Sequence, residues 1–340
     1  MEMAKIKEIV AAMTLEEKAG MCSGEDFWHT KAVERLGIPK IMVSDGPHGL
    51  RKQDENGDNP GVNDSIKAVC FPAGCGAATS FNRDLIYEMG KSLGKECQSE
   101  NVSVLLGPAV NIKRSPLCGR NFEYYSEDPY LASEIAASHI NGVQSMGVGT
   151  SIKHFMANNQ ETRRMSVSAS IDERALHEIY LAVFENAIKK SKPWTVMSSY
   201  NKVNGRYVGE NHELMTDFLR KESGFDGFVM SDWGAVGNRV AGVKAGLDLE
   251  MPGSQGVRDA LIVEAVKNGS MEESTLNTAC ERILNIVYKA VENHDSSIKV
   301  SWDDEHDKSR MIADETIVLL KNQDDILPLS MDKKIAFIGK

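Results

Sequence analysis

Short apolar runs alternate with longer stretches of helical periodicity along most of the chain. The runs are apolar throughout instead of alternating with polar residues, which is typical of strands covered on both faces. We predict strands at 40–47, 102–110, 149–155, 194–201, 227–234 and 246–253. Amphipathic patterns with capping residues at their ends predict helices at 82–101, 126–147, 172–192 and 211–224. This alternation of strand and helix predicts a parallel sheet.

Most of the predicted strands end in a polar side chain, and this feature distinguishes two parallel architectures. The residues concerned are Asp45, His154, Tyr200, Asp232 and Glu250. In an open doubly wound sheet, ligand residues gather near one switch point, whereas in a (β/α)8 barrel every strand end faces the same mouth. The sequence contains no GxGxxG or GxxxxGK[ST] turn that would favour a nucleotide-binding open sheet. We therefore expect an α/β fold of the TIM type, a (β/α)8 barrel that need not be regular.

The two ends of the chain depart from this alternation. Residues 1–18 have the pattern of an amphipathic helix, followed by a second helix with a capping box made by Thr14 and Glu17. Beyond residue 255 we expect a long helix, a polar irregular stretch at 293–310, an apolar helix around 311–320 and a terminal strand at 334–339. We divide the chain into a barrel over 1–300, a linker over 301–325 and, over 326–340, the first strand of a second α/β-sandwich domain that these residues do not contain.

Composition limits the classes of partner. The chain has 340 residues and a formal net charge of −10, which argues against nucleic-acid and anionic-membrane surfaces. No apolar run is long enough to span a bilayer, and the first residues lack the apolar region of a secretory signal, so we expect a cytoplasmic location. None of the six cysteines forms a CxxC pair or lies at a zinc-site spacing, which predicts free thiols. We expect no metal and no cofactor.

Four polar residues in two motifs have both a binding and a structural interpretation. Asp45 and Arg51 enclose the turn "DGPHGLR", where they could hold the hydroxyl groups of a polar ligand or simply pair with each other. Lys153 and His154 follow each other at the end of a predicted strand, where a binding role competes with packing behind the site. Neither pair identifies a chemistry alone.

Of five further polar or large residues, four also have a structural interpretation, and the fifth favours a ligand. Arg120 has Glu123 nearby as a possible ion-pair partner, and Arg164 could be an ordinary surface charge. Met197 and Tyr200 have the pattern of a core and a rim residue, respectively. Trp233 directly follows the strand-end Asp232, and an indole at that position suits the apolar face of a sugar ring.

Taken in order, these motifs resemble the N-terminal catalytic barrel of glycoside hydrolase family 3, on its β-glucosidase side. The matching motifs are "SDGPHGLR", "LLGPAVNIKRSPLCGRNFEYYSEDP", "SIKHF", "VMSSYN", "GFVMSDWGAV" and "GLDLEMPG". The resemblance implies that Asp232 is the catalytic nucleophile. It further implies that the subsite for the terminal sugar is lined by Asp45, Arg51, Arg120, Lys153, His154, Arg164, Met197, Tyr200 and Trp233.

The resemblance predicts a retaining, exo-acting β-glucosidase that acts on a small glycoside or an oligosaccharide. Retaining glycosidases use one ionised carboxylate as the nucleophile and a second carboxylic acid to protonate the leaving oxygen. Arg51, Arg120, Arg164 and Lys153 would hold Asp232 ionised by their positive charge. The same cations would contact sugar hydroxyls as charge develops in the transition state.

The second carboxylic acid is not apparent. In two-domain members of the family it is a glutamate of the second domain, and in the single-domain N-acetylhexosaminidase members a histidine loop after "KHF" replaces it. Here that loop, at 156–166, contains no histidine. We expect a missing C-terminal domain or a partner chain to supply the acid, and nothing in the sequence indicates an oligomeric state. The alternatives are an N-acetylhexosaminidase-like enzyme, a Schiff-base aldolase that uses Lys153, and a non-catalytic carbohydrate-binding half.

Overall fold

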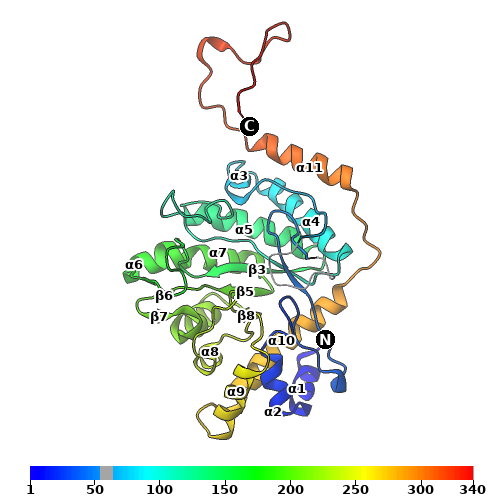
Figure 1. The fold of residues 1–340 in the computed structure, drawn as a ribbon, viewed down its shortest axis with the longest axis vertical. Helices are drawn as coiled ribbons and strands as arrows, with labels where there is room; N and C mark the ends of the chain where they lie inside the picture. Colours follow the sequence, from blue (N-terminus) through cyan, green and yellow to red (C-terminus); the bar gives the residue numbers. More distant parts are fainter. Residues whose placement is uncertain (54–63, 340) are drawn as a thin grey trace.

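The computed structural model describes residues 1–53 and 64–339, and its centre is a parallel sheet. The strands are β1 (Val43–Asp45), β2 (Val104–Leu106), β3 (Gly149–Phe155), β5 (Thr195–Ser198) and β8 (Phe228–Met230). They lie side by side in the order β1-β2-β3-β5-β8, and every neighbouring pair is parallel (Figure 1). The predicted parallel α/β fold is confirmed.

Single backbone bridges continue the pairing beyond β8 and return it to β1. In order around the sheet they are Met230–Leu249, Ser23–Glu250, Gly24–Thr30 and His29–Met42. The prediction of a regular strand at 246–253 is therefore wrong. Leu249 and Glu250 nevertheless lie next to β8 in the sheet, where a strand was expected. The N–H groups of Asp248 and Leu249 both donate to Val229 O, which is a bulge and interrupts a regular ladder. This arrangement is consistent with a TIM-like barrel that has irregular strands.

The predicted helices lie between the strands, as expected for βα units. They are α4 (Arg83–Ser99), α5 (Pro129–Gln144), α6 (Glu173–Ala175) continuing through a π-helical stretch (Leu176–Leu181) into α7 (Ala182–Ser191), and a second π-helical stretch (Glu213–Glu222). Helix α8 (Arg239–Ala245), which follows β8, was not predicted. Asn82 and Asp128 cap α4 and α5 by accepting hydrogen bonds from backbone N–H groups of the first turn. Among the described residues, none of the helices is both long enough and apolar enough to cross a membrane.

Further helices cover the opposite side and one end of the sheet (Figure 1). They are α1 (Met3–Ala12), α2 (Leu15–Met21), α9 (Val257–Lys267) and α10 (Glu273–Asn293), with α3 (Gly74–Ala78) next to α4. The predicted capping box is confirmed, since Thr14 accepts from Glu17 N and Glu17 accepts from Thr14 N. Short pieces complete the fold: 3-10 turns at Glu34–Leu36, Val208–Glu210 and Gln323–Asp325, and a small sheet of β4 (Ser168–Ala169), β6 (Lys202–Val203) and β7 (Arg206–Tyr207).

Consecutive strand residues pack into two different apolar clusters. In β2, Leu105 belongs to the cluster with α4, α5 and α7, whereas Val104 and Leu106 belong to the cluster with α1, α9 and α10. In β8, Val229 and its two neighbours divide in the same way. Both faces of the sheet are therefore apolar, which explains why the strand sequences show no alternation.

The C-terminal part differs from the sequence-based prediction. Helix α11 (Trp302–Glu315) begins inside the stretch expected to be irregular, where Ser301 caps it and Asp303, Asp304 and Glu305 occupy its first turn. Helix α11 ends at Glu315, so the second half of the apolar helix expected around 311–320 is not helical. Residues 334–339, where we expected a strand, form none. Figure 1 shows the segment after α11 looping away from the body of the molecule before its end turns back toward α11, and residues 334–339 are exposed. The proposed division at residues 301, 325 and 326 stays a prediction.

We expect the segment 317–339 to exchange its amide hydrogens far faster than α10. Leu320, Phe337 and Ile338 are 91%, 95% and 97% exposed, and few backbone hydrogen bonds hold this segment. Segments with few buried contacts open with a free-energy cost near zero, whereas core helices approach the global stability. Hydrogen–deuterium exchange with mass spectrometry measures this directly. Protection of 317–339 equal to that of α10 would contradict the exposed conformation.

Candidate active site

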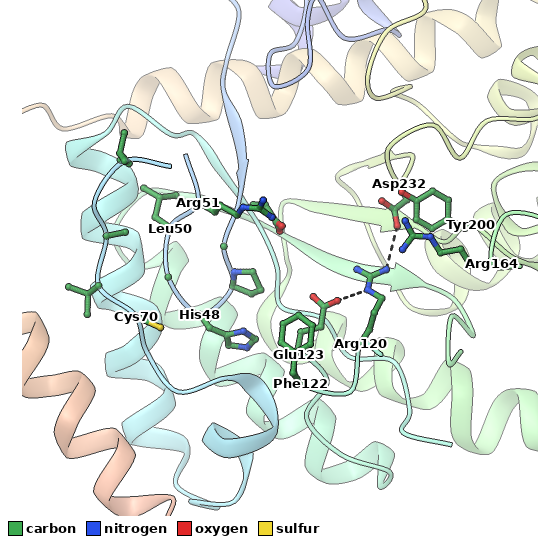
Figure 2. Close-up of a pocket in the computed structure, with 17 residues that line it drawn as sticks. His48, Leu50, Arg51, Cys70, Arg120, Phe122, Glu123, Arg164, Tyr200 and Asp232 are labelled. Atoms are coloured by element: carbon green, nitrogen blue, oxygen red, sulfur yellow. Dashed lines mark hydrogen bonds and ion pairs between the residues drawn. The ribbon is translucent and has the colours of Figure 1, made fainter. Parts of the chain in front are cut away.

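A cavity of about 720 Å³ opens at the carboxyl ends of the central strands. The turn that follows β1, residues 45–51, and the segment 66–70 form one wall. Arg120 and Glu123 lie at the base, Arg164 and Tyr200 form the opposite wall, and Asp232 lies where that wall meets the base beside Arg120 (Figure 2). The fold thus brings together polar residues from loops after several strands, as expected for the mouth of a TIM-type barrel.

Asp232 follows β8 and is 7% exposed. Its Oδ1 accepts a hydrogen bond of 2.8 Å from the backbone N–H of Trp233. Its Oδ2 is buried without a hydrogen-bond partner, and lies 4.0 Å from Arg120 Nη1 and 3.6 Å from His154 Nε2. A buried carboxylate oxygen without a donor is uncommon in native proteins, so Oδ2 is an atom that a ligand could engage.

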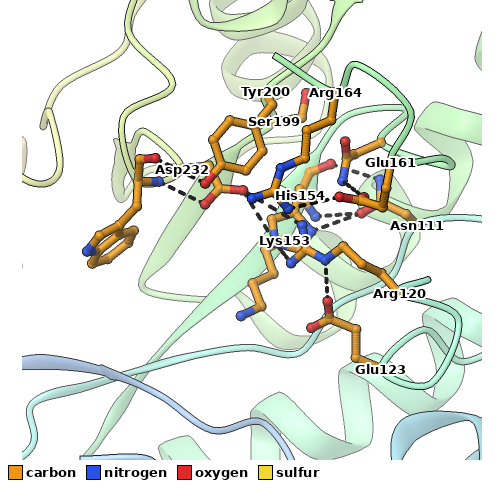
Figure 3. Close-up of polar contacts among 12 residues, drawn as sticks. Asn111, Arg120, Glu123, Lys153, His154, Glu161, Arg164, Ser199, Tyr200 and Asp232 are labelled. Atoms are coloured by element: carbon orange, nitrogen blue, oxygen red, sulfur yellow. Dashed lines mark hydrogen bonds and ion pairs between the residues drawn. The ribbon is translucent and has the colours of Figure 1, made fainter. Parts of the chain in front are cut away.

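The guanidinium group of Arg120 is held by two of its three nitrogens. Its Nε donates to Glu123 Oε1 at 2.6 Å, and its Nη2 donates to His154 Nε2 at 2.6 Å (Figure 3). The remaining nitrogen, Nη1, is buried without a partner and is the atom nearest to Asp232. An unused donor and an unused acceptor therefore lie side by side at the base of the cavity.

His154 is neutral in this arrangement. Its Nε2 accepts from Arg120, so its proton is on Nδ1, which lies 3.2 Å from Asn111 Oδ1. Burial, followed by the positive charges of Arg120, Lys153 and Arg164, holds the pKa of His154 well below its usual value. The ring is fully enclosed and supports Arg120, whereas the cavity lining does not include it.

The electrostatic environment of Asp232 differs from the prediction made from its cationic neighbours. Burial raises the pKa of Asp232 above its ordinary value, although Arg120, the Trp233 N–H, Lys153 and Tyr200 each act to lower it. The predicted effect of the cations is present for Arg120 and Lys153, but burial opposes it, so the ionised state of this carboxyl stays a prediction. Loss of hydration outweighs the stabilisation by the cations, because the carboxyl is covered on most sides by protein.

Asp45 and Lys153 form an ion pair at the ends of β1 and β3, with Lys153 Nζ 2.8 Å from Asp45 Oδ1; the Lys153 side chain is buried, whereas that of Asp45 is 35% exposed. Burial raises the pKa of Asp45, but the charge and hydrogen bond of Lys153 outweigh it, and the net pKa is lowered. Arg51 contributes to this lowering, and its backbone N–H donates to Asp45 O at 2.9 Å, which closes the turn. The partner of the Asp45 carboxylate is thus chiefly Lys153, in place of the mutual pairing with Arg51 that the sequence left open.

The remaining predicted residues divide between the cavity and its surroundings. Arg164 donates to Glu161 Oε2 at 2.8 Å and its guanidinium lies 4.4 Å from the centre of the Tyr200 ring. Tyr200 donates from its hydroxyl to Trp233 O at 3.0 Å. Both Arg164 and Tyr200 line the cavity.

Trp233 and Met197 do not line the cavity. The indole of Trp233 packs against the rings of Phe27 and Trp28, and its Nε1 donates to Phe27 O at 2.9 Å. Met197 is buried with Phe228 and Met230 in the apolar core beneath the site. Met197 is thus a core residue, as its sequence pattern suggested, and not part of the cavity lining that the family resemblance implied.

Several site residues were not selected from the sequence. Glu123 and Asn111 fix Arg120 and His154, and His48 and Phe122 line the cavity. Glu123 was noted only as an ion-pair partner, and the others carry no local signal beyond their place in loops after strands. Within the part of the chain that the structure describes, no group of three or more His, Cys, Asp or Glu side chains is arranged to hold a metal ion.

Comparison with known proteins identifies the family to which the chain belongs. Residues 29–286 match the model described as the glycosyl hydrolase family 3 N-terminal domain. The chain is 60% identical over 334 residues to thermostable beta-glucosidase B of Acetivibrio thermocellus, a match that covers 98% of this chain and 44% of that protein. It is 48% identical over 347 residues to the exo-alpha-(1->6)-L-arabinopyranosidase of Bifidobacterium longum, which covers 97% and 45%, respectively.

Solved structures give the same result. Beta-glucosidase 3B from Thermotoga neapolitana in complex with alpha-D-glucose aligns with a TM-score of 0.90 at 43% identity, over 96% of this chain and 48% of that chain. The family 3 beta-glucosidase of Bifidobacterium adolescentis aligns with a TM-score of 0.88 at 48% identity, over 94% and 46%. The present chain thus spans less than half the length of these relatives.

Proposed function

The chain belongs to glycosyl hydrolase family 3, and we propose that it is the part of a β-glucosidase that binds the terminal sugar and supplies the nucleophile. The observation that carries this proposal is the pair of unused atoms at the base of the cavity, Asp232 Oδ2 and Arg120 Nη1. A sugar ring bound there would place its anomeric carbon near the carboxylate and a hydroxyl near the guanidinium. Isolation of a covalent glucosyl ester on Asp232 tests the assignment.

The proposed reaction is a double displacement with retention of configuration. Asp232 Oδ2 attacks the anomeric carbon, and the bond from that carbon to the leaving oxygen breaks. A general acid protonates the leaving oxygen in this first step. Water then attacks the same carbon from the opposite face, its proton passes to the conjugate base of that acid, and the bond from the carbon to Asp232 breaks to release the carboxylate. The Trp233 N–H on Oδ1 fixes the carboxylate plane, and the charge of Arg120 lowers the energy of the anion.

The remaining carboxyl groups around the cavity support the proposal that the general acid comes from elsewhere. Asp45 is paired with Lys153, Glu123 with Arg120 and Glu161 with Arg164 among the residues described. Each of these carboxyl groups already contacts a cation of its own, whereas a general acid must be free to deliver a proton to the leaving oxygen. We therefore propose that a further domain or a partner chain supplies the acid, as the resemblance implied.

Two alternatives are less well supported by the site. The Lys153 ammonium group donates to Asp45, whereas a Schiff-base lysine needs a neutral amine with a free electron pair. The loop at 156–166 contributes Asn158, Glu161 and Arg164 and has no histidine to serve an N-acetylhexosaminidase-like mechanism. A non-catalytic sugar-binding role shares the same cavity and is distinguished by the covalent trapping of Asp232.

A second candidate substrate follows from the Bifidobacterium longum relative, whose name describes release of L-arabinopyranose. L-Arabinopyranose lacks the hydroxymethyl group of glucose and has the opposite configuration at C4, so the two sugars differ in the space that they need at one edge of the ring and in the direction of one hydroxyl group. Initial rates with nitrophenyl β-D-glucoside and nitrophenyl α-L-arabinopyranoside, compared as kcat/KM, decide between them.

We expect Asp45→Ala to weaken D-glucose binding about 10- to 100-fold. Under the proposed function the carboxylate accepts charge-assisted hydrogen bonds from sugar hydroxyls, each contributing about 1.5–3 kcal/mol. Isothermal titration calorimetry with D-glucose measures the affinity, and circular dichroism with urea unfolding checks that the fold survives the loss of the Lys153 partner. Unchanged glucose affinity in a folded variant would show that Asp45 serves only its ion pair.

A further inference from the structure

Glu96 is a buried carboxyl group outside the contacts around Asp232, yet it lies directly behind the cavity wall. It belongs to α4 and is 1% exposed. Its Oε1 accepts a hydrogen bond of 3.2 Å from the backbone N–H of Val69. The backbone N–H of Leu50 also faces this carboxyl and acts to lower its pKa. One side chain therefore contacts two wall segments that are distant from it in the sequence.

These two segments form the wall that faces Asp232. Leu50 lies between Asp45 and Arg51 in the turn after β1, and Val69 lies in the segment 66–70. The segments touch each other, because a side-chain carbon at Gly49 would lie only 2.7 Å from Val69 O. Phe71 N also donates to His48 O at 2.8 Å. The wall is thus one unit. Glu96 attaches it to α4, next to two further contacts: Lys52 Nζ donates to Glu100 O at 3.0 Å, and Ser309 of α11 donates to Cys70 O at 2.7 Å.

The surroundings of Glu96 make this attachment sensitive to protonation. Burial raises the pKa of Glu96 to about 7; the Val69 N–H opposes this, and Glu305 and Glu100 add to it by their negative charge. Glu305 comes from α11, where Lys308 is 3.3 Å and Lys95 of α4 is 3.4 Å from its Oε1. Glu100 faces Lys52 at 3.5 Å. Glu96 Oε2 itself has no partner among the described residues.

We propose that Glu96 is a positioning residue that anchors both wall segments of the sugar cavity to α4. Its significance for catalysis rests on the proposed function, because the wall carries Asp45 and Arg51. Loss of the acceptor would leave the Val69 N–H buried without a partner, a condition that native proteins avoid. The wall would then open more often, and the affinity for the sugar would fall with it.

The dependence on pH follows from the direction of the shift. A carboxyl whose pKa is higher in the closed wall than in water stabilises the closed state fully at low pH, and this stabilisation is lost as the pH rises through about 7. Opening of the wall returns Glu96 to water and becomes easier in the same range. Between pH 5 and pH 8 we expect protection of the wall to fall roughly tenfold or more.

Hydrogen–deuterium exchange of peptides covering 46–50 and 66–71 tests the proposal on the 340-residue protein, after correction for the intrinsic pH dependence of exchange. Wild type should lose protection of these peptides between pH 5 and pH 8. Glu96→Gln keeps one acceptor oxygen and is neutral throughout, so its protection should be independent of pH. Glu96→Ala should be poorly protected at every pH. Glu88→Gln, an exposed change on the same helix, should behave as wild type.

D-glucose binding by calorimetry, measured in parallel, separates this inference from the proposed function. A Gln variant with the wild-type pH profile, or an Ala variant with unchanged protection, would overturn the anchoring role; if the Ala variant does not fold, the Gln profile decides. If the exchange profiles are as predicted but neither wild type nor any variant binds glucose, the anchoring role of Glu96 is supported and the proposed function is contradicted. Glucose binding equal in wild type and the Ala variant would show that the wall does not serve the sugar.

Discussion

Asp232→Asn is expected to abolish covalent labelling by a 2-deoxy-2-fluoro-β-D-glucoside that carries a dinitrophenyl leaving group. Such a leaving group departs without protonation, so labelling requires only the nucleophile. An amide oxygen is a poor nucleophile, and loss of a catalytic nucleophile lowers turnover by roughly 10⁴-fold or more. Intact-mass spectrometry should show the added fluoroglucosyl mass on wild type and none on the variant. Peptide mapping should locate it on the "SDWG" peptide.

The substitution preserves shape, which makes the result interpretable. Asparagine can still accept the Trp233 N–H bond on its carbonyl oxygen, so the turn after β8 should be retained. Asp45→Asn is the matched control, because it changes a second carboxylate of the same cavity. It should slow labelling through weaker sugar binding and still give the full mass increase. Full labelling of Asp232→Asn, or a label on Asp45 or Glu250, would assign the nucleophile elsewhere.

The parallel sheet could be predicted because each strand is a short run of consecutive apolar residues, which can be recognised from the sequence alone. Leu105 and its two neighbours are apolar for the same physical reason, burial on one face or the other. The last helix and the terminal strand were not predictable in this way. The apolar run at 317–320 has helical periodicity, but propensity alone does not hold a helix in water without a surface to pack on. The Ser301 cap with three following acidic residues was the stronger signal, and it marks α11.

The site was predictable as a set of strand-end residues, but its contacts were not. The motifs indicated Arg120, His154 and Asp232 separately, while the hydrogen bond from Arg120 to His154 joins residues of different loops. The direction of the Asp232 pKa depends on how many protein atoms exclude water, which composition does not reveal. Glu96 shows the same limit: its position on a helix indicates burial, and only the fold brings Val69 and Leu50 to it.

We expect residues 1–340 alone to turn over dinitrophenyl β-D-glucoside while hydrolysing cellobiose very slowly. The second glucose unit of cellobiose leaves as an alkoxide unless an acid protonates the glycosidic oxygen, and general acid catalysis contributes about 10²–10⁴-fold. Among the described residues, each carboxyl group near Asp232 other than Asp232 itself is paired with a cation. Stopped assays of glucose release from cellobiose and absorbance assays of dinitrophenolate release measure the two rates on the same protein.

Azide separates a missing acid/base from an inactive site. Once Asp232 holds the sugar, azide can attack the anomeric carbon without a general base, whereas water needs one; two inversions then give β-glucosyl azide. Azide should therefore accelerate dinitrophenolate release, with β-glucosyl azide detected by NMR, and Asp232→Asn should give none. Adding the part of thermostable beta-glucosidase B outside the matched region should raise cellobiose hydrolysis, by placing a carboxyl about 5–5.5 Å from Asp232. Rapid cellobiose hydrolysis by these 340 residues without azide would mean that an acid already lies within them.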